Sequence, residues 1–236
     1  GLTNLSLKEK VSRKQFKNKY KKRKEPANYS GRKYEDYLKF VKENPSAITV
    51  EMDTVMNSLS GPYIQTFIFP NTSFMIGFIH KEKTSEKMSK TLDTLQERLG
   101  DEYYTKLFSL ILTDRGSEFE KHELFEINME TGELRTNIFY CDPMQSYQKP
   151  HVENNHNYIR DILPHGVDLS FLTQEKVDLM FSHINSVPRE CYAGKTPYEM
   201  FEFLYDKEDK IMNLFNIQKI KRDEVVLKPY LLKNVK

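Results

Sequence analysis

Two hydrophobic periods alternate along the chain, and each change of period marks a new element. Residues 48–55 (ITVEMDTV), Tyr63–Phe69 and Phe74–His80 are rich in β-branched and aromatic residues, which predicts three strands. The last two are separated only by a short turn, residues 70–73, so we expect them to form an antiparallel hairpin. The domain is therefore predicted to open with three antiparallel strands.

From Ser85 the apolar residues recur with the period of a helix, and Gly100 predicts where that helix ends. Its apolar face consists of Met88, Leu92, Leu95 and Leu99. The apolar run 107–112 follows and predicts a buried strand that leads into Asp114. A carboxylate at the tip of a buried strand is costly unless it meets a cation, so this strand end is the first candidate for chemistry.

The rest of the chain reads mainly as helices. Residues 124–127 and 136–140 flank a turn, which predicts either a hairpin or a short helix and a strand. A helix over residues 151–163 ends at a proline and a glycine; Thr173 caps the next helix, and Thr196 opens the last with a capping box. One further amphipathic helix, from Tyr34 to Asn44, precedes the strands.

This order of elements predicts an α/β fold with a mixed five-stranded sheet flanked by helices. Three strands, a helix, a strand, a short connection, a strand and then helices is the order of the ribonuclease H-like fold. We expect a basic arm at residues 1–27 and a linker helix at 28–47. We expect the catalytic core at 48–190 and a helical segment with a short basic tail at 191–236.

Charge is distributed very unevenly over the 236 residues. The net charge is only +2, but residues 1–24 carry ten Lys or Arg and one Glu, and residues 217–236 carry six Lys or Arg and two acids. Residues 25–216 are therefore strongly acidic. Basic ends around an acidic centre suit a protein that binds a polyanion at its ends and uses carboxylates at its centre. A solvated basic helix beside an ordinary acidic domain is the alternative; a capping box at Ser6 predicts such a helix over residues 8–24.

Several classes of protein are excluded by what the sequence lacks. It has no run of 18 apolar residues and no signal-peptide pattern, so we expect no membrane association. Two cysteines cannot form a disulfide framework, which favours a reducing cytoplasm. The cysteines and six histidines show no zinc-finger spacing, and no P-loop or nucleophile elbow is present.

Three carboxylates are placed where a metal-dependent site needs them. Asp53 lies within the first strand and Asp114 ends the fourth, and these two strands are neighbours in a ribonuclease H-like sheet. Glu153 lies on the late helix. Asn157 and Arg160 follow at i+4 and i+7, so the three residues share the polar face of that helix. Converging carboxylates repel one another until divalent ions bind, and oxygen ligands suit Mg²⁺ or Mn²⁺. Each acid taken alone is more simply a surface residue; their combination favours a metal site.

Two other acids compete with these three. Asp142 precedes Pro143, and we expect it to begin the polar loop that follows. Glu118 lies four residues after Asp114, and we expect it to organise the turn there.

At these residues the chain resembles a known family. The motifs are VEMDTV (50–55), ILTDRGSEF (111–119), FYCDP (139–143), YQK (147–149), VENNHNYIRDILPHGVDLS (152–170) and HINSVPRECYAGKTPYEMF (183–201). In this order they resemble the catalytic region of bacterial insertion-sequence transposases of the family numbered thirty, in the DDE transposase/integrase superfamily. The resemblance extends over about residues 30–205, and the ENN–IR–PHG segment is its most specific part.

The resemblance implies a ribonuclease H-like core with Asp53, Asp114 and Glu153 as a catalytic triad holding two Mg²⁺ or Mn²⁺ ions. It implies cleavage of transposon-end DNA and strand transfer of the 3′-hydroxyl into target DNA. Double-stranded DNA, both transposon ends and target, is the expected partner, with a homodimer or higher synaptic oligomer in the bacterial cytoplasm, at the nucleoid. The residues expected to contact DNA are Asn157, Arg160, Lys149, Arg115, Lys21, Lys22, Arg23 and Lys24.

The chain departs from the family at three places. Arg115 replaces the usual Asn after the second Asp, where it is expected to contact phosphate or disturb the turn. Lys149-Pro150-His151 replaces a glycine-rich stretch. The family's N-terminal helix-turn-helix domain is absent and the chain starts at Gly1, so we expect a fragment. Two alternatives to an active transposase core remain: a ribonuclease H-like nuclease without joining activity, and a catalytically decayed DNA-binding module.

Overall fold

The computed structural model describes residues 29–206 and 210–233. Side chains are not described for four residues within this range, residues 146 and 152–154. The basic helix predicted over residues 8–24 lies outside the described residues, as do Lys21, Lys22, Arg23 and Lys24.

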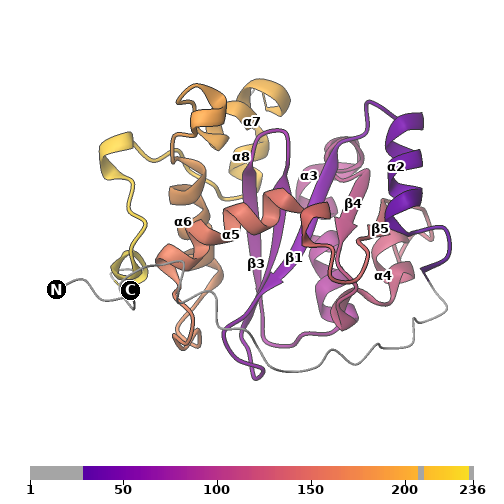
Figure 1. Cartoon of the computed structure of the whole chain (residues 1–236), viewed down its shortest axis with the longest axis horizontal. Helices are drawn as coiled ribbons and strands as arrows, with labels where there is room; N and C mark the ends of the chain where they lie inside the picture. Colours follow the sequence, from indigo (N-terminus) through magenta and orange to yellow (C-terminus); the bar gives the residue numbers. More distant parts are fainter. Residues whose placement is uncertain (1–28, 207–209, 234–236) are drawn as a thin grey trace.

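One mixed sheet of five strands forms the centre of the molecule (Figure 1). Its strands are β1 (Thr49–Val55), β2 (Tyr63–Phe69), β3 (Phe74–His80), β4 (Leu110–Thr113) and β5 (Asn137–Tyr140). The order across the sheet is β3-β2-β1-β4-β5; β1, β2 and β3 pair antiparallel, and β4 and β5 run parallel to β1. This order and these directions are those of the ribonuclease H-like sheet, so the predicted fold is confirmed.

Helices cover both faces of the sheet. The α-helices are α2 (Tyr34–Glu43), α3 (Ser85–Leu107), α4 (His122–Glu126), α5 (Pro150–Ile162), α6 (Gln174–Asn185), α7 (Pro197–Tyr205) and α8 (Lys210–Leu214). The short 3₁₀ helices are η3 (Ser117–Phe119), η4 (Ser146–Gln148), η5 (Glu190–Tyr192), η6 (Arg222–Glu224) and η7 (Pro229–Leu232). No helix in the described ranges has the length and apolar character needed to cross a bilayer.

The alternation of side chains along the strands assigns each helix to a face. Asp53 and its cross-strand partner Thr66 point to the first face, where α2, α5 and α6 pack. Met52 and Gln65 point to the second face, which α3 covers with the same apolar face that the sequence predicts. In Figure 1, α5 crosses in front of the strands and α2 stands at the opposite end of the sheet from α6. The first face therefore carries the predicted site.

One predicted boundary is wrong. The helix that begins at Ser85 ends at Gly100 as predicted, where the glycine has φ 73°, and a second helical segment of α3 follows it to Leu107. The next strand is Leu110–Thr113 rather than residues 107–112, because Leu107 and Phe108 belong to the end of the helix. Both are fully buried in the core. A short apolar run has the same appearance at a buried helix end and in a buried strand, so periodicity alone cannot separate them.

Other boundaries follow the predicted caps. The Thr173 hydroxyl accepts a hydrogen bond from the backbone N–H of Lys176 at 3.3 Å at the start of α6. Thr196 and Glu199 form the predicted capping box at the start of α7. Between β4 and β5 the chain makes the helix-and-strand alternative, α4 followed by β5, joined to the hairpin-like bridge between Ile127 and Leu134.

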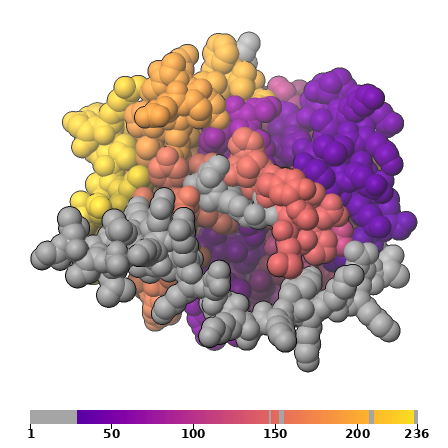
Figure 2. Space-filling view, in the orientation of Figure 1, coloured from indigo at the N-terminus to yellow at the C-terminus, as the bar shows by residue number. Residues whose placement is uncertain are grey.

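The C-terminal segment packs against the end of the sheet that carries β3. Phe201 of α7 contacts Phe69 and Phe74 with ring centroids 5.0 and 4.3 Å apart. The last 3₁₀ helix lies against α5 and α6, and its Leu232 is fully buried. Figure 2 shows these late residues, in orange and yellow, forming one end of the molecule, with the indigo residues of α2 at the other.

Candidate active site

Parallel pairing of β1 and β4 brings Asp53 and Asp114 to one edge of the sheet. Glu51 pairs with Leu112, so the positions two residues further along each strand, Asp53 and Asp114, are level with each other and on the same face. The pKa of Asp114 is raised by burial, and the negative charges of Asp53 and Glu118 raise it further against the opposing effect of Lys149. Asp114 still has an exposed face, so the loss of hydration is partial. The charge of Asp53 is therefore close enough to act on the ionisation of Asp114.

The turn after β4 is built around a buried carboxylate. Asp114 Oδ1 accepts a hydrogen bond from the backbone N–H of Gly116 at 3.1 Å. A Cβ atom at Gly116 would lie 2.6 Å from Glu118 Oε2, so a larger residue here would force the Glu118 carboxylate to shift. Glu118 is buried and forms an ion pair with Lys83 at 2.9 Å. That Glu118 organises this turn stays a prediction.

Lys149 places a positive charge beside Asp53. Its side chain is 8% exposed; its Nζ lies 3.5 Å from Asp53 Oδ2 and donates to the backbone O of Met52 at 3.1 Å. Burial disfavours the ammonium, but Asp53 and Asp114 outweigh that effect, so the pKa of Lys149 is raised above its usual value. The two aspartates therefore stabilise the charged form of a lysine that belongs to the protein.

Helix α5 lies across the same face and carries Glu153. The side chain of Glu153 is not described, but its place on the helix is defined by His156, one turn further on. His156 Nε2 lies 3.2 Å from the hydroxyl of Thr66, and Thr66 is the cross-strand partner of Asp53. Burial lowers the pKa of His156 to about 4, so its ring is neutral at neutral pH. The helix face that contains His156 and, one turn earlier, position 153 thus lies against the strand of Asp53.

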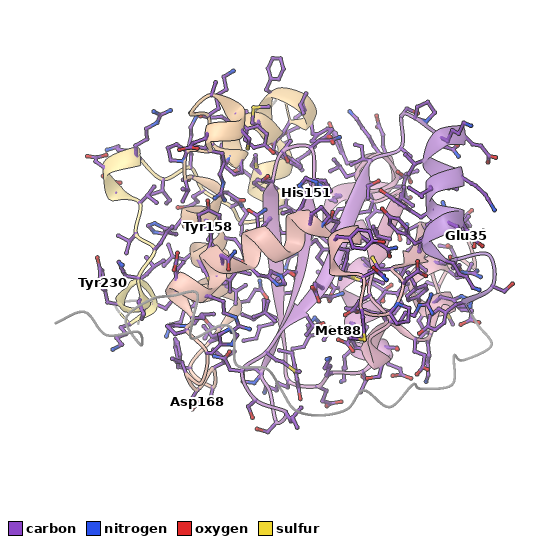
Figure 3. All side chains as sticks on the ribbon, viewed as in Figure 1. Glu35, Met88, His151, Tyr158, Asp168 and Tyr230 are labelled. Atoms are coloured by element: carbon purple, nitrogen blue, oxygen red, sulfur yellow. The ribbon has the colours of Figure 1, made fainter. Side chains whose placement is uncertain are left out.

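Arg189, which follows α6, holds the orientation of α5 through contacts with two residues of that helix. Its guanidinium stacks on the Tyr158 ring at 3.6 Å and donates to Asn155 Oδ1 at 3.3 Å. Burial lowers the pKa of Arg189 to about 10. In Figure 3, His151 marks the half of α5 over the central strands and Tyr158 the half nearer α6. Asn155 and Tyr158 thus anchor the helix. Neither residue belongs to the predicted polar face of Glu153, Asn157 and Arg160.

The predicted DNA-contacting residues on α5 have different surroundings. Asn157 is exposed. The Arg160 guanidinium donates to the backbone O of Met56 at 3.2 Å and contacts Asn57 Oδ1, so it joins α5 to the loop after β1. Asn57 in turn donates to the backbone O of Pro164 at 2.9 Å. Arg160 therefore supports the loop beside the site, and its contact with DNA stays a prediction.

Arg115 is engaged within the protein. It donates from Nε to the backbone O of Cys141 at 3.1 Å, pairs with Asp142 at 3.2 Å and lies 5.1 Å from the ring centroid of Tyr29. Asp142 also exchanges hydrogen bonds with Gln148, at the start of the polar loop, as the sequence predicts. Arg115 thus ties the end of β4 to the end of β5, and phosphate contact by this side chain stays a prediction.

The donor set fits a divalent cation in part. Among the side chains that the structure describes, no group of three His, Cys, Asp or Glu residues is arranged to hold a metal ion. The side chain of Glu153 is not among those described. Asp53 and Asp114 supply two carboxylates that are level on one face of the sheet, and the buried ammonium of Lys149 pairs with Asp53 there. Oxygen donors with a strong negative potential suit Mg²⁺ or Mn²⁺.

Two features of the site were absent from the sequence reasoning. The contact between His156 and Thr66 was missed because a lone histidine on a helix carries no signal of its own. Lys149 was expected to contact DNA, and its ion pair with Asp53 was not foreseen. The sequence signal for Lys149 is its position directly before Pro150, at the start of the helix that carries Glu153, which places it near the carboxylates.

Comparison with known proteins yields relatives over part of the chain. The transposase InsI of insertion sequence element IS30A from Escherichia coli is 34% identical over 89 residues, which are 38% of this chain and 22% of that protein. The transposase of IS4351 from Bacteroides fragilis is 32% identical over 96 residues, 41% of this chain and 28% of that protein. Over about two fifths of its length, this chain is similar to IS30-type transposases. The resemblance predicted from the motifs is confirmed.

The IS30-type relatives extend to other bacteria and are matched only in part. The transposase of IS1086 from Cupriavidus metallidurans is 31% identical over 87 residues, 37% of this chain and 24% of that protein. In each case the match spans about a quarter of the relative's length. No family model matches the chain.

Solved structures give a looser comparison. The crystal structure of the BIV integrase catalytic core domain is 19% identical, with a TM-score of 0.45, and the alignment covers 66% of this chain and 93% of that one. The assignment of the ribonuclease H-like fold rests on strand order and direction.

Proposed function

We propose that the chain is the catalytic core of a DDE transposase, a polynucleotidyl transferase that cuts transposon-end DNA and joins the 3′-hydroxyl to target DNA. The observation that carries the proposal is the placement of Asp53 and Asp114 on neighbouring parallel strands, under the helix that bears Glu153. The partial identity with IS30-type transposases supports the same reading.

In this proposal Asp53, Asp114 and Glu153 hold two Mg²⁺ or Mn²⁺ ions. Bound there, such ions polarise the phosphodiester and lower the pKa of the attacking water or 3′-hydroxyl. The protein's own residues position the carboxylates: Gly116 holds Asp114 through its backbone N–H, and the backbone N–H of Thr54 donates to Asp53 Oδ1 at 2.7 Å. No covalent enzyme intermediate is required, because the chain orients the reacting groups and compensates their charge.

Duplex DNA is the proposed partner, and Asn157 is an exposed polar residue on α5, four residues after position 153. Arg160, Lys149, Arg115 and the basic residues Lys21, Lys22, Arg23 and Lys24 complete the proposed contact set. A homodimer or higher synaptic oligomer in the bacterial cytoplasm is part of the same proposal, because two transposon ends must be joined together.

The test is nicking of supercoiled plasmid by the 236-residue chain with Mn²⁺, and joining of a labelled duplex that ends in a 3′-hydroxyl. We expect Mn²⁺-dependent nicking and joining that fall by at least about 100-fold in Asp114→Asn, because a charge-stabilising group at the reacting phosphate is lost. Glu97→Gln, an exposed acid on α3, is the matched control and should retain activity.

The outcomes separate the alternatives. Nicking of an RNA–DNA hybrid without joining would indicate a ribonuclease H-like nuclease. Salt-sensitive DNA binding without any metal-dependent nicking would indicate a DNA-binding module. Equal nicking by the parent chain and Asp114→Asn would refute the assignment of this site.

A further inference from the structure

The Lys149 ammonium occupies a position that a divalent cation also favours. It lies 3.5 Å from Asp53 Oδ2 and 3.1 Å from the backbone O of Met52, and both are oxygen atoms of the kind that bind Mg²⁺. Lys149 is only 6% exposed, so its side chain is packed within the site and is not a mobile side chain on the surface. Lysine cannot be a ligand while it is charged, since an ammonium has donors and no acceptor.

The backbone holds the lysine in place. Lys149 is the residue before Pro150, the first residue of α5, so its main chain is fixed by the same helix that carries position 153. The side chain has four rotatable carbon–carbon bonds, and its ammonium is a compact point charge. The anchor is thus rigid and the charged end is movable, which allows the ammonium to leave the carboxylates without unfolding the helix.

We propose that Lys149 is an internal counter-ion of Asp53 and Asp114 that divalent cations must displace, so that metal entry releases the lysine toward DNA phosphate. This inference rests on the proposed metal-dependent function and adds to it a residue that sets metal affinity. Two positive charges a few ångströms apart repel strongly at a partly buried site. The ammonium and the metal therefore exclude each other, and the displaced ammonium becomes available to an anion.

Isothermal titration of the full chain with Mn²⁺ alone tests the exchange. Lys149→Gln removes the charge and keeps a polar side chain, and we expect it to bind Mn²⁺ at least about tenfold more tightly than the parent chain. Lys149→Arg keeps the charge and should bind no more tightly than the parent. Lys90→Gln, an exposed lysine on α3 on the other face of the sheet, controls for net charge and should leave the affinity unchanged.

A second arm follows the released lysine. In Ca²⁺, the logarithmic salt dependence of duplex DNA binding should be about 0.9 less steep in Lys149→Gln than in the parent chain, because one phosphate contact is lost. In EDTA the two slopes should agree, because Lys149 is then held by Asp53. Equal slopes in Ca²⁺ would overturn the second half of the proposal.

The failure of this inference differs from the failure of the proposed function. If the parent chain binds Mn²⁺, Asp53→Asn abolishes binding and Lys149→Gln binds as the parent does, the metal site stands and the counter-ion role is refuted. If neither the parent nor Lys149→Gln binds Mn²⁺, the proposed metal-dependent function fails and this inference fails with it.

Discussion

Two polar clusters lie on opposite faces of the sheet. The core network consists of Gln65, His80 and Thr91, on the face covered by α3. The carboxylate edge consists of Asp53, Asp114 and Lys149, on the face covered by α5.

The clusters differ in how their members are satisfied. In the core network the Thr91 hydroxyl donates to Gln65 Oε1 at 2.7 Å, His80 Nε2 lies 3.0 Å from the same oxygen, and the Gln65 amide reaches Met52 Sδ at 3.2 Å. All of these groups are neutral. Buried neutral groups that satisfy one another stabilise a unique packing.

The carboxylate edge is instead left with like charges side by side and one buried ammonium. Burial and the neighbouring acids Asp53 and Glu118 raise the pKa of Asp114, which shows that ionisation there is disfavoured in the fold. The core network is thus satisfied by hydrogen bonds, whereas the repulsion between charges at the carboxylate edge lowers the stability of the fold. Perturbed ionisation of this kind clusters at functional sites.

The largest expected effect concerns pH and the neutral histidine of the core network. Burial lowers the pKa of His80 from 6.5 to about 4, so its neutral form contributes fully above pH 6.5 and this stability is lost as the pH falls toward 4. In urea unfolding from pH 6.5 to 4.5, His80→Gln should lose stability less steeply than the parent chain, by up to about 1.4 kcal/mol per pH unit. Parallel pH profiles would show that His80 is charged in the native state.

The next effect removes one hydrogen bond from the core network. Thr91→Val is nearly isosteric and leaves Gln65 and His80 with one partner fewer, so the free energy of unfolding should fall by about 1–2 kcal/mol. The matched control is Thr94→Val on the same helix, because the Thr94 hydroxyl donates only to the backbone O of Lys90, at 3.1 Å. Urea denaturation of both variants gives the comparison; an equal loss would mean that the network adds nothing.

The smallest effect should have the opposite sign. Because the pKa of Asp114 is raised in the fold, its charge opposes stability above its unfolded pKa, and that cost disappears in acid. Asp114→Asn should therefore stabilise the metal-free chain at pH 7, by no more than about 1 kcal/mol because the residue is partly exposed. Thermal unfolding in EDTA at pH 7 and pH 4 measures it. A destabilised variant at pH 7 would mean that attraction to Lys149 outweighs repulsion from Asp53.

Much of the fold follows from local patterns. The hairpin strands Tyr63–Phe69 and Phe74–His80 match the structure at both ends, because alternating β-branched and aromatic residues are bounded there by turn residues. Thr173 and Thr196 marked two helix starts correctly, since capping is chemistry between neighbouring residues. The end of α3 and the start of β4 could not be located, since Leu107 and Phe108 are buried in either structure.

The sequence by itself determined the order of elements, the similarity to IS30-type transposases and the carboxylate at the end of the fourth strand, Asp114. Only the tertiary structure decided that Asp53 and Asp114 stand level on one face, that Arg115 turns to Cys141 and Asp142, and that Lys149 pairs with Asp53. The reason is physical. Periodicity and caps depend on neighbours in the chain, whereas the partner of a charge depends on which distant segments pack together.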